Sequence, residues 1–325
     1  MALPRTVDFH AHAQSPKAAE LMAGAPNAPR ADANPHNEHL QATRYRAAFE
    51  DIAVRMQTMD RQRIEMQVVS PAPNYAYWAD QDLSPRIAAA SNEHVAEVCA
   101  RHPERLVGLG HVSLQFPDLA AQQVGTVLDS LGLKGVEIGT RAEDVDLDDP
   151  RLDAFWAAAS TRRAPVFIHP AGTTLGKRVA KYYLTNVIGN PLDTTIALTN
   201  LIFGGVLERF PELRIVAAHG GGYLPSYFSR SHHGYEVRPE LRTVPHPPMH
   251  YLRRVTVDNL VYEPEYLAHI VNVIGASQVV LGTDYPFDMG QDNPVDLLEA
   301  VGGLDAANME RIKSGNALRL LGMQS

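Results

Sequence analysis

Asp8-Phe9-His10-Ala11-His12 closes the first apolar run of the chain and offers two imidazoles to one metal ion. Residues two apart in a β-strand point to the same face, so His10 and His12 can reach a single ion without a bend in the backbone. Such a pair suits zinc or a similar divalent cation. Because two packed or solvated histidines would give the same pattern, further ligands must come from elsewhere in the chain.

Three later apolar runs also end on a residue that binds metals, namely His169, His219 and Asp284. Each ending alone is compatible with a buried histidine bonded to the backbone, or with an aspartate that caps a helix. Four such endings in one chain instead indicate the carboxyl-terminal face of a (β/α)8 barrel, where the catalytic groups gather.

The rest of the chain alternates short apolar runs with segments of helical periodicity. Strands are predicted at 6–9, 66–70, 106–110, 135–138, 166–168, 215–218, 255–258 and 279–281. Helices are predicted at 47–59, 85–100, 120–131, 152–161, 194–210 and 265–274. This alternation predicts an α/β fold, a distorted (β/α)8 TIM barrel, and the length of 325 residues fits one domain over residues 1–325.

Two stretches break the alternation. A segment at about 13–45 is rich in Ala, Pro, Asn and His and lacks periodicity, and residues 171–192 follow His169 in the same way. Long loops inside a compact domain are usually functional, so we expect both segments to cover the site.

Composition excludes several classes of function. The net charge of −8, with scattered basic residues, argues against a nucleic-acid partner. The single cysteine, Cys99, is expected to be a buried packing residue, and no apolar run approaches the length of a membrane span. Since the first residues also lack the pattern of a signal peptide, we expect a soluble cytoplasmic protein.

Four motifs carry a family resemblance. They are Asp-Phe-His-Ala-His at 8–12, Phe-Ile-His-Pro at 167–170, Ala-His-Gly-Gly-Gly-Tyr-Leu-Pro at 218–225 and Leu-Gly-Thr-Asp-Tyr-Pro-Phe at 281–287. In this order they resemble the amidohydrolase superfamily and, within it, the aminocarboxymuconate-semialdehyde decarboxylase family. The resemblance implies a metal-dependent barrel of the amidohydrolase type that acts as a non-oxidative decarboxylase, a carboxy-lyase, in the catabolism of aromatic compounds.

The resemblance also implies roles for individual residues. His10, His12, His169 and Asp284 would bind one divalent metal ion, with Zn²⁺ expected and Mn²⁺ as the other candidate. His219 would act with Asp284 in catalysis, standing beside the metal's water to take its proton. The alternative is that His219 is itself a ligand, as in binuclear relatives. Against a second ion, no lysine ends a strand between His12 and His169.

Arginines are expected to hold the substrate's carboxylate groups. Arg230 occupies the position where the family places an arginine that reaches into a neighbouring subunit's site, which implies a homodimer or a higher homo-oligomer. Arg44 or Arg46 corresponds to a second substrate-binding arginine. Tyr183 lies in the loop where the family's decarboxylase carries tryptophans, so a hydroxylated aromatic or pyridine carboxylic acid, or another unsaturated acid, is the expected small-molecule substrate.

Two other functions remain open at this point. A hydrolase or hydratase of the same superfamily, acting on a ring-cleavage product, would use the same metal shell. A metal-binding or storage protein would use the ligands alone, although it would need neither His219 nor a substrate arginine.

Overall fold

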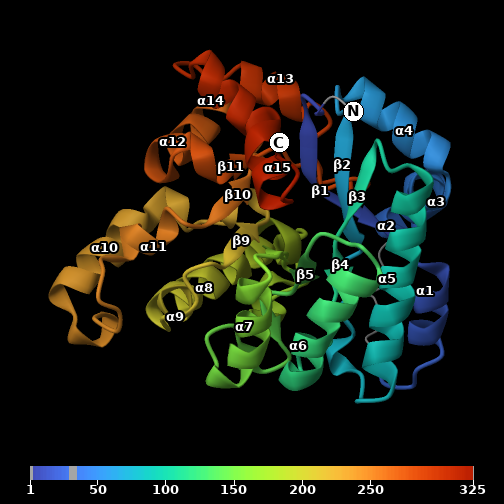
Figure 1. The fold of residues 1–325 in the computed structure, drawn as a ribbon, viewed down its shortest axis with the longest axis horizontal. Coiled ribbons are helices and arrows are strands. Elements are labelled where there is room, and N and C mark those ends of the chain that lie inside the picture. The colour runs from blue at the N-terminus through green and yellow to red at the C-terminus, as the bar shows by residue number, and fades with distance from the viewer. Residues whose placement is uncertain (1–2, 29–34, 325) are drawn as a thin grey trace.

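Eight parallel strand segments of the barrel surround one axis in the computed structural model, which describes residues 3–28 and 35–324 (Figure 1). The strands are β1 (Val7–Ala13), β2 (Met66–Pro71), β3 (Leu106–Gly108) with β4 (Gly110–His111), β5 (Val136–Ile138), β8 (Pro165–Ile168), β9 (Arg214–Ala217), β10 (Thr256–Asp258) and β11 (Val279–Val280). A short antiparallel pair, β6 (Arg141–Ala142) with β7 (Val145–Asp146), stands apart.

Hydrogen bonds close the strands into a ring. One sheet has the order β1-β2-β3 and the other the order β11-β10-β9-β8-β5-β4, and β3 and β4 form one barrel strand interrupted at Leu109. Parallel bridges from Asp8 to Leu281 and from Ala11 to Tyr285 join β1 to the end of β11. The predicted (β/α)8 barrel is therefore confirmed.

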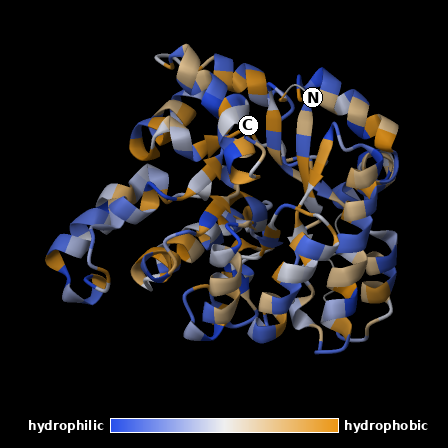
Figure 2. Cartoon of the chain, in the orientation of Figure 1, coloured by the Kyte–Doolittle hydropathy of each residue, from blue (hydrophilic) through white to orange (hydrophobic). Residues whose placement is uncertain are grey.

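Helices cover the outside of the barrel, with apolar residues concentrated on the strands between them (Figures 1 and 2). They are α1 (Pro16–Ala23), α2 (Pro35–Leu40), α3 (Arg46–Glu50), α4 (Ile52–Arg61), α5 (Leu83–Arg101), α6 (Pro117–Gly125), α7 (Asp153–Thr161), α8 (Asn190–Phe203), α9 (Val206–Arg209), α10 (Phe228–Val237), α11 (Pro248–Leu252), α12 (Pro264–Ile274), α13 (Pro294–Glu299), α14 (Ala306–Glu310) and α15 (Asn316–Leu320). In the described part of the chain, none is both long and apolar enough to span a membrane.

Two predicted helices are broken in the structure. The one predicted at 47–59 divides into α3 and α4 at Asp51, whose extended backbone lets its carboxylate accept from the amide of Ala53 at 2.8 Å and so start a new helix. The one predicted at 194–210 divides at Gly204 and Gly205, because Gly205 takes a left-handed φ of 73°.

The segment at about 13–45 is more regular than the sequence suggested. Ser15 caps α1 by accepting from the amide of Ala18 at 3.2 Å, and α2 runs into a π-helical turn, η1 (Gln41–Tyr45). Elements this short span too few turns for an apolar periodicity to show. Residues 29–34 of the predicted loop lie outside the described residues. The second stretch, 171–192, holds the short turns η5 (Gly176–Val179) and η6 (Thr185–Gly189).

A bulge in β1 orients His10 and His12. The pairing of β1 with β2 shifts register between Asp8 and Ala11. Val7 and Phe9 pack in the apolar cluster that fills the barrel, whereas Ala11 packs outside it against Ala48 and Tyr285. The extra residue of a bulge changes which face a side chain occupies, so His10 and His12 point inward above Phe9.

The floor of the barrel is closed from below. Residues of α15 and its end, Ala317, Leu318, Leu320 and Leu321, pack in the same buried cluster as Val7, Phe9 and Phe167 of the strands. The cavity for chemistry is therefore confined to the opposite, carboxyl-terminal end.

Asp8 ties the first strand to the last. Its fully buried carboxylate accepts from the amide and hydroxyl of Thr283 at 3.0 and 2.6 Å, from Gln67 Nε2 at 2.8 Å and from the amide of His10 at 3.0 Å. One side chain thus joins three segments that meet beneath the site.

Asp8→Asn should destabilise the protein by about 1–3 kcal/mol. The side-chain NH2 group of asparagine is a hydrogen-bond donor, and it would face N–H and O–H groups that are themselves donors. Thermal unfolding checks this, with Asp144→Asn on the exposed β6–β7 turn as the matched control. Equal melting temperatures for the two variants would contradict the role given to Asp8.

Candidate metal centre

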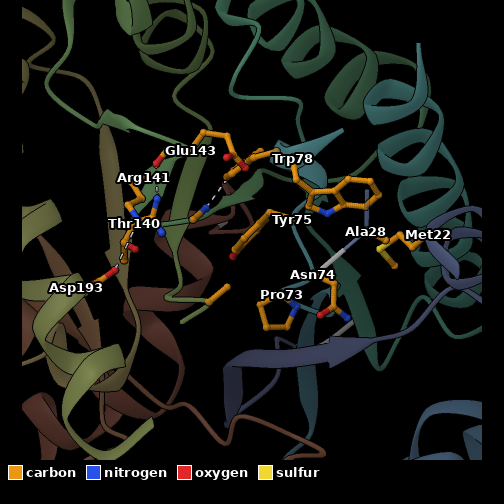
Figure 3. Close-up of a pocket in the computed structure, with 13 residues that line it drawn as sticks. Met22, Ala28, Pro73, Asn74, Tyr75, Trp78, Thr140, Arg141, Glu143 and Asp193 are labelled. Carbon is orange, nitrogen blue, oxygen red and sulfur yellow. Dashed lines mark hydrogen bonds and ion pairs between the residues drawn. The ribbon is translucent and has the colours of Figure 1, made fainter. Parts of the chain in front are cut away.

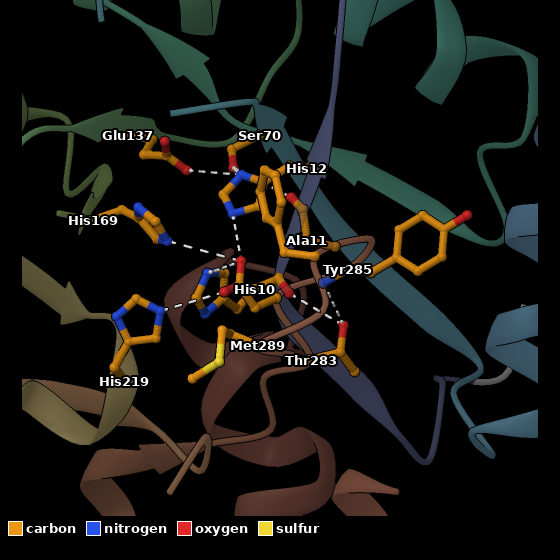
Figure 4. Close-up of polar contacts among 12 residues, drawn as sticks. His10, Ala11, His12, Ser70, Glu137, His169, His219, Thr283, Tyr285 and Met289 are labelled. Atoms are coloured by element: carbon orange, nitrogen blue, oxygen red, sulfur yellow. Dashed lines mark hydrogen bonds and ion pairs between the residues drawn. The ribbon is translucent and has the colours of Figure 1, made fainter. Parts of the chain in front are cut away.

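Four strand ends bring their polar residues to one point (Figure 4). The Asp284 carboxylate is at the centre. Its Oδ1 lies 3.3 Å from His10 Nε2, 3.2 Å from His12 Nε2 and 3.9 Å from His169 Nε2. Its other oxygen, Oδ2, lies 3.4 Å from His219 Nε2. The structure therefore brings together all five residues that the sequence singled out for metal binding and catalysis.

The buried atoms of this cluster lack hydrogen-bond partners among the described residues. His10 Nε2, His12 Nε2, His169 Nε2 and Asp284 Oδ1 are all buried and unsatisfied. Burying polar atoms without partners is costly, and a divalent cation would satisfy nitrogen and carboxylate ligands together. One ligand atom each from His10, His169, His219 and Asp284 lies within 4.8 Å of the other three. The donor set fits a divalent metal ion.

The electrostatics agree with a cation site. Burial opposes ionisation of Asp284, but His10 and its neighbours hold the pKa of this carboxyl well below its usual range. Burial and the surrounding imidazoles keep the pKa of His169 well below 6.5. Although burial alone would lower it, Asp284 and Asp258 raise the pKa of His10 to about 10. Asp284 is thus anionic and His169 neutral, as metal ligands must be.

Neighbouring side chains orient the imidazoles. Asp258 Oδ2 lies 2.7 Å from His10 Nδ1 and also accepts from the amide of His219 at 3.0 Å. Ser70 Oγ lies 3.1 Å from His12 Nδ1, and Glu137 Oε2 lies 3.7 Å from the same atom. With Nδ1 of His10 and of His12 engaged, the Nε2 atoms of these two residues are directed to the centre.

The three-glycine motif after His219 reflects a tight turn. His219 itself has a φ of 56°, and Gly220 and Gly222 follow at 64° and 66°. A Cβ on Gly222 would lie 2.1 Å from the carbonyl oxygen of Pro191, and one on Gly220 would lie 2.4 Å from a methyl group of Val261. Glycine at these positions lets the backbone present His219 at the strand end while packing against α8.

A cavity of about 810 Å³ opens above the cluster. His169, His219 and Asp284 lie on its wall, together with Arg46 and Tyr183. Arg44 does not line it, since its guanidinium donates to the carbonyl oxygen of Phe287 at 3.4 Å and lies 3.9 Å from Asp292. Of the two alternatives for a substrate arginine, the structure thus places Arg46 at the cavity.

Arg230 lies apart from the cavity of its own chain. It is exposed on α10, a helix that projects away from the barrel beside α11 (Figure 1). Among residues 3–28 and 35–324 it makes no ion pair and no side-chain hydrogen bond.

Sequence reasoning missed the residues that orient the ligands. Asp258 ends the predicted strand 255–258 and thus had the same signal as Asp284, a carboxylate closing an apolar run. Glu137 lies inside a predicted apolar strand, and no spacing rule marks it. Its role is visible only in the folded barrel, where β5 pairs with β4 and His111 Nε2 of β4 lies 3.1 Å from its Oε1.

The comparison with protein families decides the identity of the fold. The model described as Amidohydrolase matches residues 7–323. The chain belongs to the amidohydrolase family. This amidohydrolase is 36% identical over 276 residues to 2-amino-3-carboxymuconate-6-semialdehyde decarboxylase of Dictyostelium discoideum, a match that covers 84% of this chain and 77% of the relative.

Further relatives are also decarboxylases. Gamma-resorcylate decarboxylase of Rhodococcus jostii is 25% identical over 72% of this chain and 77% of its own. The crystal structure of 5-carboxyvanillate decarboxylase from Novosphingobium aromaticivorans, complexed with manganese and 4-hydroxy-3-methoxy-5-nitrobenzoic acid, superposes with a TM-score of 0.84 at 21% identity, covering 98% of this chain and 96% of that one. These matches confirm the family, the barrel and the decarboxylase class predicted from the motifs.

Protein stripped of metal by a chelator should lose stability as the pH rises from 6.5 to 10. His10 has a pKa of about 10 in the folded protein, against an ordinary value of 6.5. A raised folded-state pKa contributes stability that is complete below pH 6.5 and is lost toward pH 10, on the order of 1 kcal/mol per pH unit. Melting temperatures across this range, with and without added Zn²⁺, check it. Bound Zn²⁺ should reduce the dependence of stability on pH, because the ion replaces the proton of His10. A stripped protein that becomes more stable over this pH range would contradict this prediction.

Proposed function

We propose that this amidohydrolase is a metal-dependent, non-oxidative decarboxylase of a small unsaturated or hydroxylated aromatic or pyridine carboxylic acid. The observation that carries the proposal is the buried cluster of imidazoles around Asp284 at the wall of a cavity large enough for a ring acid. The decarboxylase relatives support the same reaction class.

We assign the metal to His10, His12, His169 and Asp284. The geometry at Asp284 supports this set, because the Nε2 atoms of the three histidines face Oδ1 whereas His219 faces Oδ2. A divalent cation held there would act as a Lewis acid toward the substrate's oxygen atoms. Zn²⁺ is the expected ion, and the manganese of the 5-carboxyvanillate enzyme supports Mn²⁺ as the other candidate.

His219 and Asp284 would manage the proton. In a decarboxylation the bond from the ring carbon to the carboxyl group breaks, its electron pair stays on the ring carbon, and a proton takes the place of the departing carbon dioxide. His219 Nε2 would deliver that proton, and its distance of 3.4 Å from Asp284 Oδ2 supports this role. The backbone amide of His219 donates to Asp258, which holds the segment that carries the imidazole.

The walls of the cavity would orient the acid. Arg46 offers a guanidinium to a carboxylate or phenolate. Tyr183, half-exposed, and Phe287 line the same cavity and supply aromatic faces. A flat, unsaturated acid suits these surfaces. The expected cytoplasmic location stays a prediction.

The purified enzyme should release carbon dioxide from a suitable ring acid. His219→Ala should keep its metal while its rate falls roughly 10²- to 10⁴-fold, because general acid–base help is lost without a ligand being removed. His12→Ala should lose both metal and activity. Metal analysis and carbon dioxide release together check these outcomes.

His269→Ala, on the exposed face of α12, is the matched control and should keep metal and activity. Equal loss of metal from His219→Ala and His12→Ala would assign His219 to the metal instead. Net addition of water without carbon dioxide release would make the enzyme a hydrolase or hydratase.

We propose in addition that the active unit is a homodimer in which Arg230 completes the partner's site. Arg230 lies on a projecting helix and not at its own cavity. Exposed apolar side chains lie nearby: Val187, Tyr223 and Tyr262 line one hollow beside His219, and they are 45, 38 and 48% exposed. An apolar surface of this kind at the edge of a site supports burial against a second copy.

A mixed dimer of Arg230→Ala and His219→Ala chains should recover one site of wild-type kcat and KM, although each parent alone is impaired. Arg230→Ala alone should raise KM while the metal stays bound, because a buried carboxylate loses its partner. Arg86→Ala on α5 is the control and should match the wild type. Failure to complement after verified subunit exchange would place Arg230 outside any shared site.

A further inference from the structure

The structure has a second cavity, of about 710 Å³, which Figure 3 shows in close-up. Its residues follow the carboxyl ends of the strands: Tyr75 and Tyr77 come after β2, and Thr140 and Arg141 come after β5. Since catalytic and binding groups of such barrels gather at this end, the cavity opens on the functional face.

The two cavities share part of their walls. Pro73, Asn74 and Ala171 line both. Tyr75, on the wall of the second cavity, donates to the backbone oxygen of His169 at 3.2 Å and to Glu137 Oε1 at 2.7 Å. The two cavities are thus adjacent at this shared wall, and Tyr75 connects the second cavity to the metal ligand His169 and to Glu137.

Arg141 supplies a cation with unused donors. Its guanidinium donates to the backbone oxygen of Glu143, and its Nε lies 3.9 Å from Asp193 Oδ2, which is too far for a hydrogen bond. The guanidinium has five N–H groups, so most of them are left for a ligand. Thr173 Oγ1 donates to Asp193 Oδ1 at 3.1 Å. Burial also raises the pKa of the Asp193 carboxyl, so Asp193 competes less with a ligand carboxylate for the Arg141 guanidinium.

Aromatic rings form another part of the wall. Tyr75 and Tyr77 stack with ring centroids 5.2 Å apart and 10° between their planes, and Trp78 lies at the far side of the cavity (Figure 3). Flat apolar faces in the same cavity as a guanidinium suit an unsaturated chain or ring substituent that ends in an anion.

We propose that this second cavity is a substrate subsite, in which Arg141 binds a second carboxylate carried on an arm of the acid whose first carboxyl group is removed. The inference rests on the proposed decarboxylase function. It predicts that the enzyme prefers an extended diacid to a compact ring acid as its substrate. Arg141 would then determine specificity without taking part in the chemistry.

A matched series of probes tests the subsite. We would use 2,6-dihydroxybenzoate and two derivatives with an arm at ring carbon 4, one carboxymethyl and one aminomethyl. The carboxymethyl acid should bind the metal-loaded enzyme at least about tenfold more tightly than the parent, as expected for a charge-assisted hydrogen bond. Arg141→Met should remove this advantage and leave the parent unchanged, with kcat unaffected where turnover occurs.

The tryptophans provide a readout that does not depend on turnover. The chain has two, and Trp156 is fully buried in the core, so Trp78 reports on the second cavity. Binding of the carboxymethyl acid should change its fluorescence, and Trp78→Phe should abolish the signal. Arg178→Met, exposed and outside both cavities, is the control and should behave as the wild type.

The outcomes separate the two proposals. Any of three outcomes would overturn the subsite. The parent and the carboxymethyl acid could bind with equal affinity, or Arg141→Met could bind the carboxymethyl acid as tightly as the wild type does. The aminomethyl derivative, attracted by Glu143 and Asp193, could also bind more tightly than the carboxymethyl acid. Absence of carbon dioxide from every acid, with the Trp78 signal and its dependence on Arg141 intact, would overturn the decarboxylase function and leave the subsite standing.

Discussion

The negative charge of Asp284 is the constraint around which the site is arranged. Oδ1 faces three imidazole nitrogens and Oδ2 faces a fourth, all with little access to water. Such a group of buried donors and acceptors is costly unless a cation joins it. The bulge in β1, the turn at His219 and the carboxylate of Asp258 all serve to hold the imidazoles at the right distance from this one carboxylate.

The parts of the fold that could be predicted are those that depend on local sequence patterns. Short apolar runs ending on His or Asp gave the strands, and the barrel then followed because parallel strands bring such endings to one face. His10, His12, His169, His219 and Asp284 were found this way. Breaks in the helices at Asp51 and Gly205 were missed, because a cap or a left-handed residue interrupts an apolar period without changing its average.

Other features depend on contacts between distant segments and could not be read locally. Glu137 of β5 approaches His12 of β1 only because the closed barrel directs side chains from strands that are not sheet neighbours toward one axis. The bulge between Asp8 and Ala11 is equally invisible in sequence, although it decides which face His10 occupies. Arg44 and Arg46 are two residues apart, and only the π-helical turn that ends at Tyr45 shows that Arg46 borders the cavity while Arg44 turns to Asp292.

The packed floor of the barrel has a consequence for the order of assembly. Leu318 and Leu321 seal the strands from below, against Phe9 and Phe167, so solutes reach the histidines from one end. An acid seated in the cavity covers that approach. The ion must therefore enter first and the acid second, and a bound acid would hold the ion in place until it departs, so that metal exchange is slow whenever the enzyme is saturated.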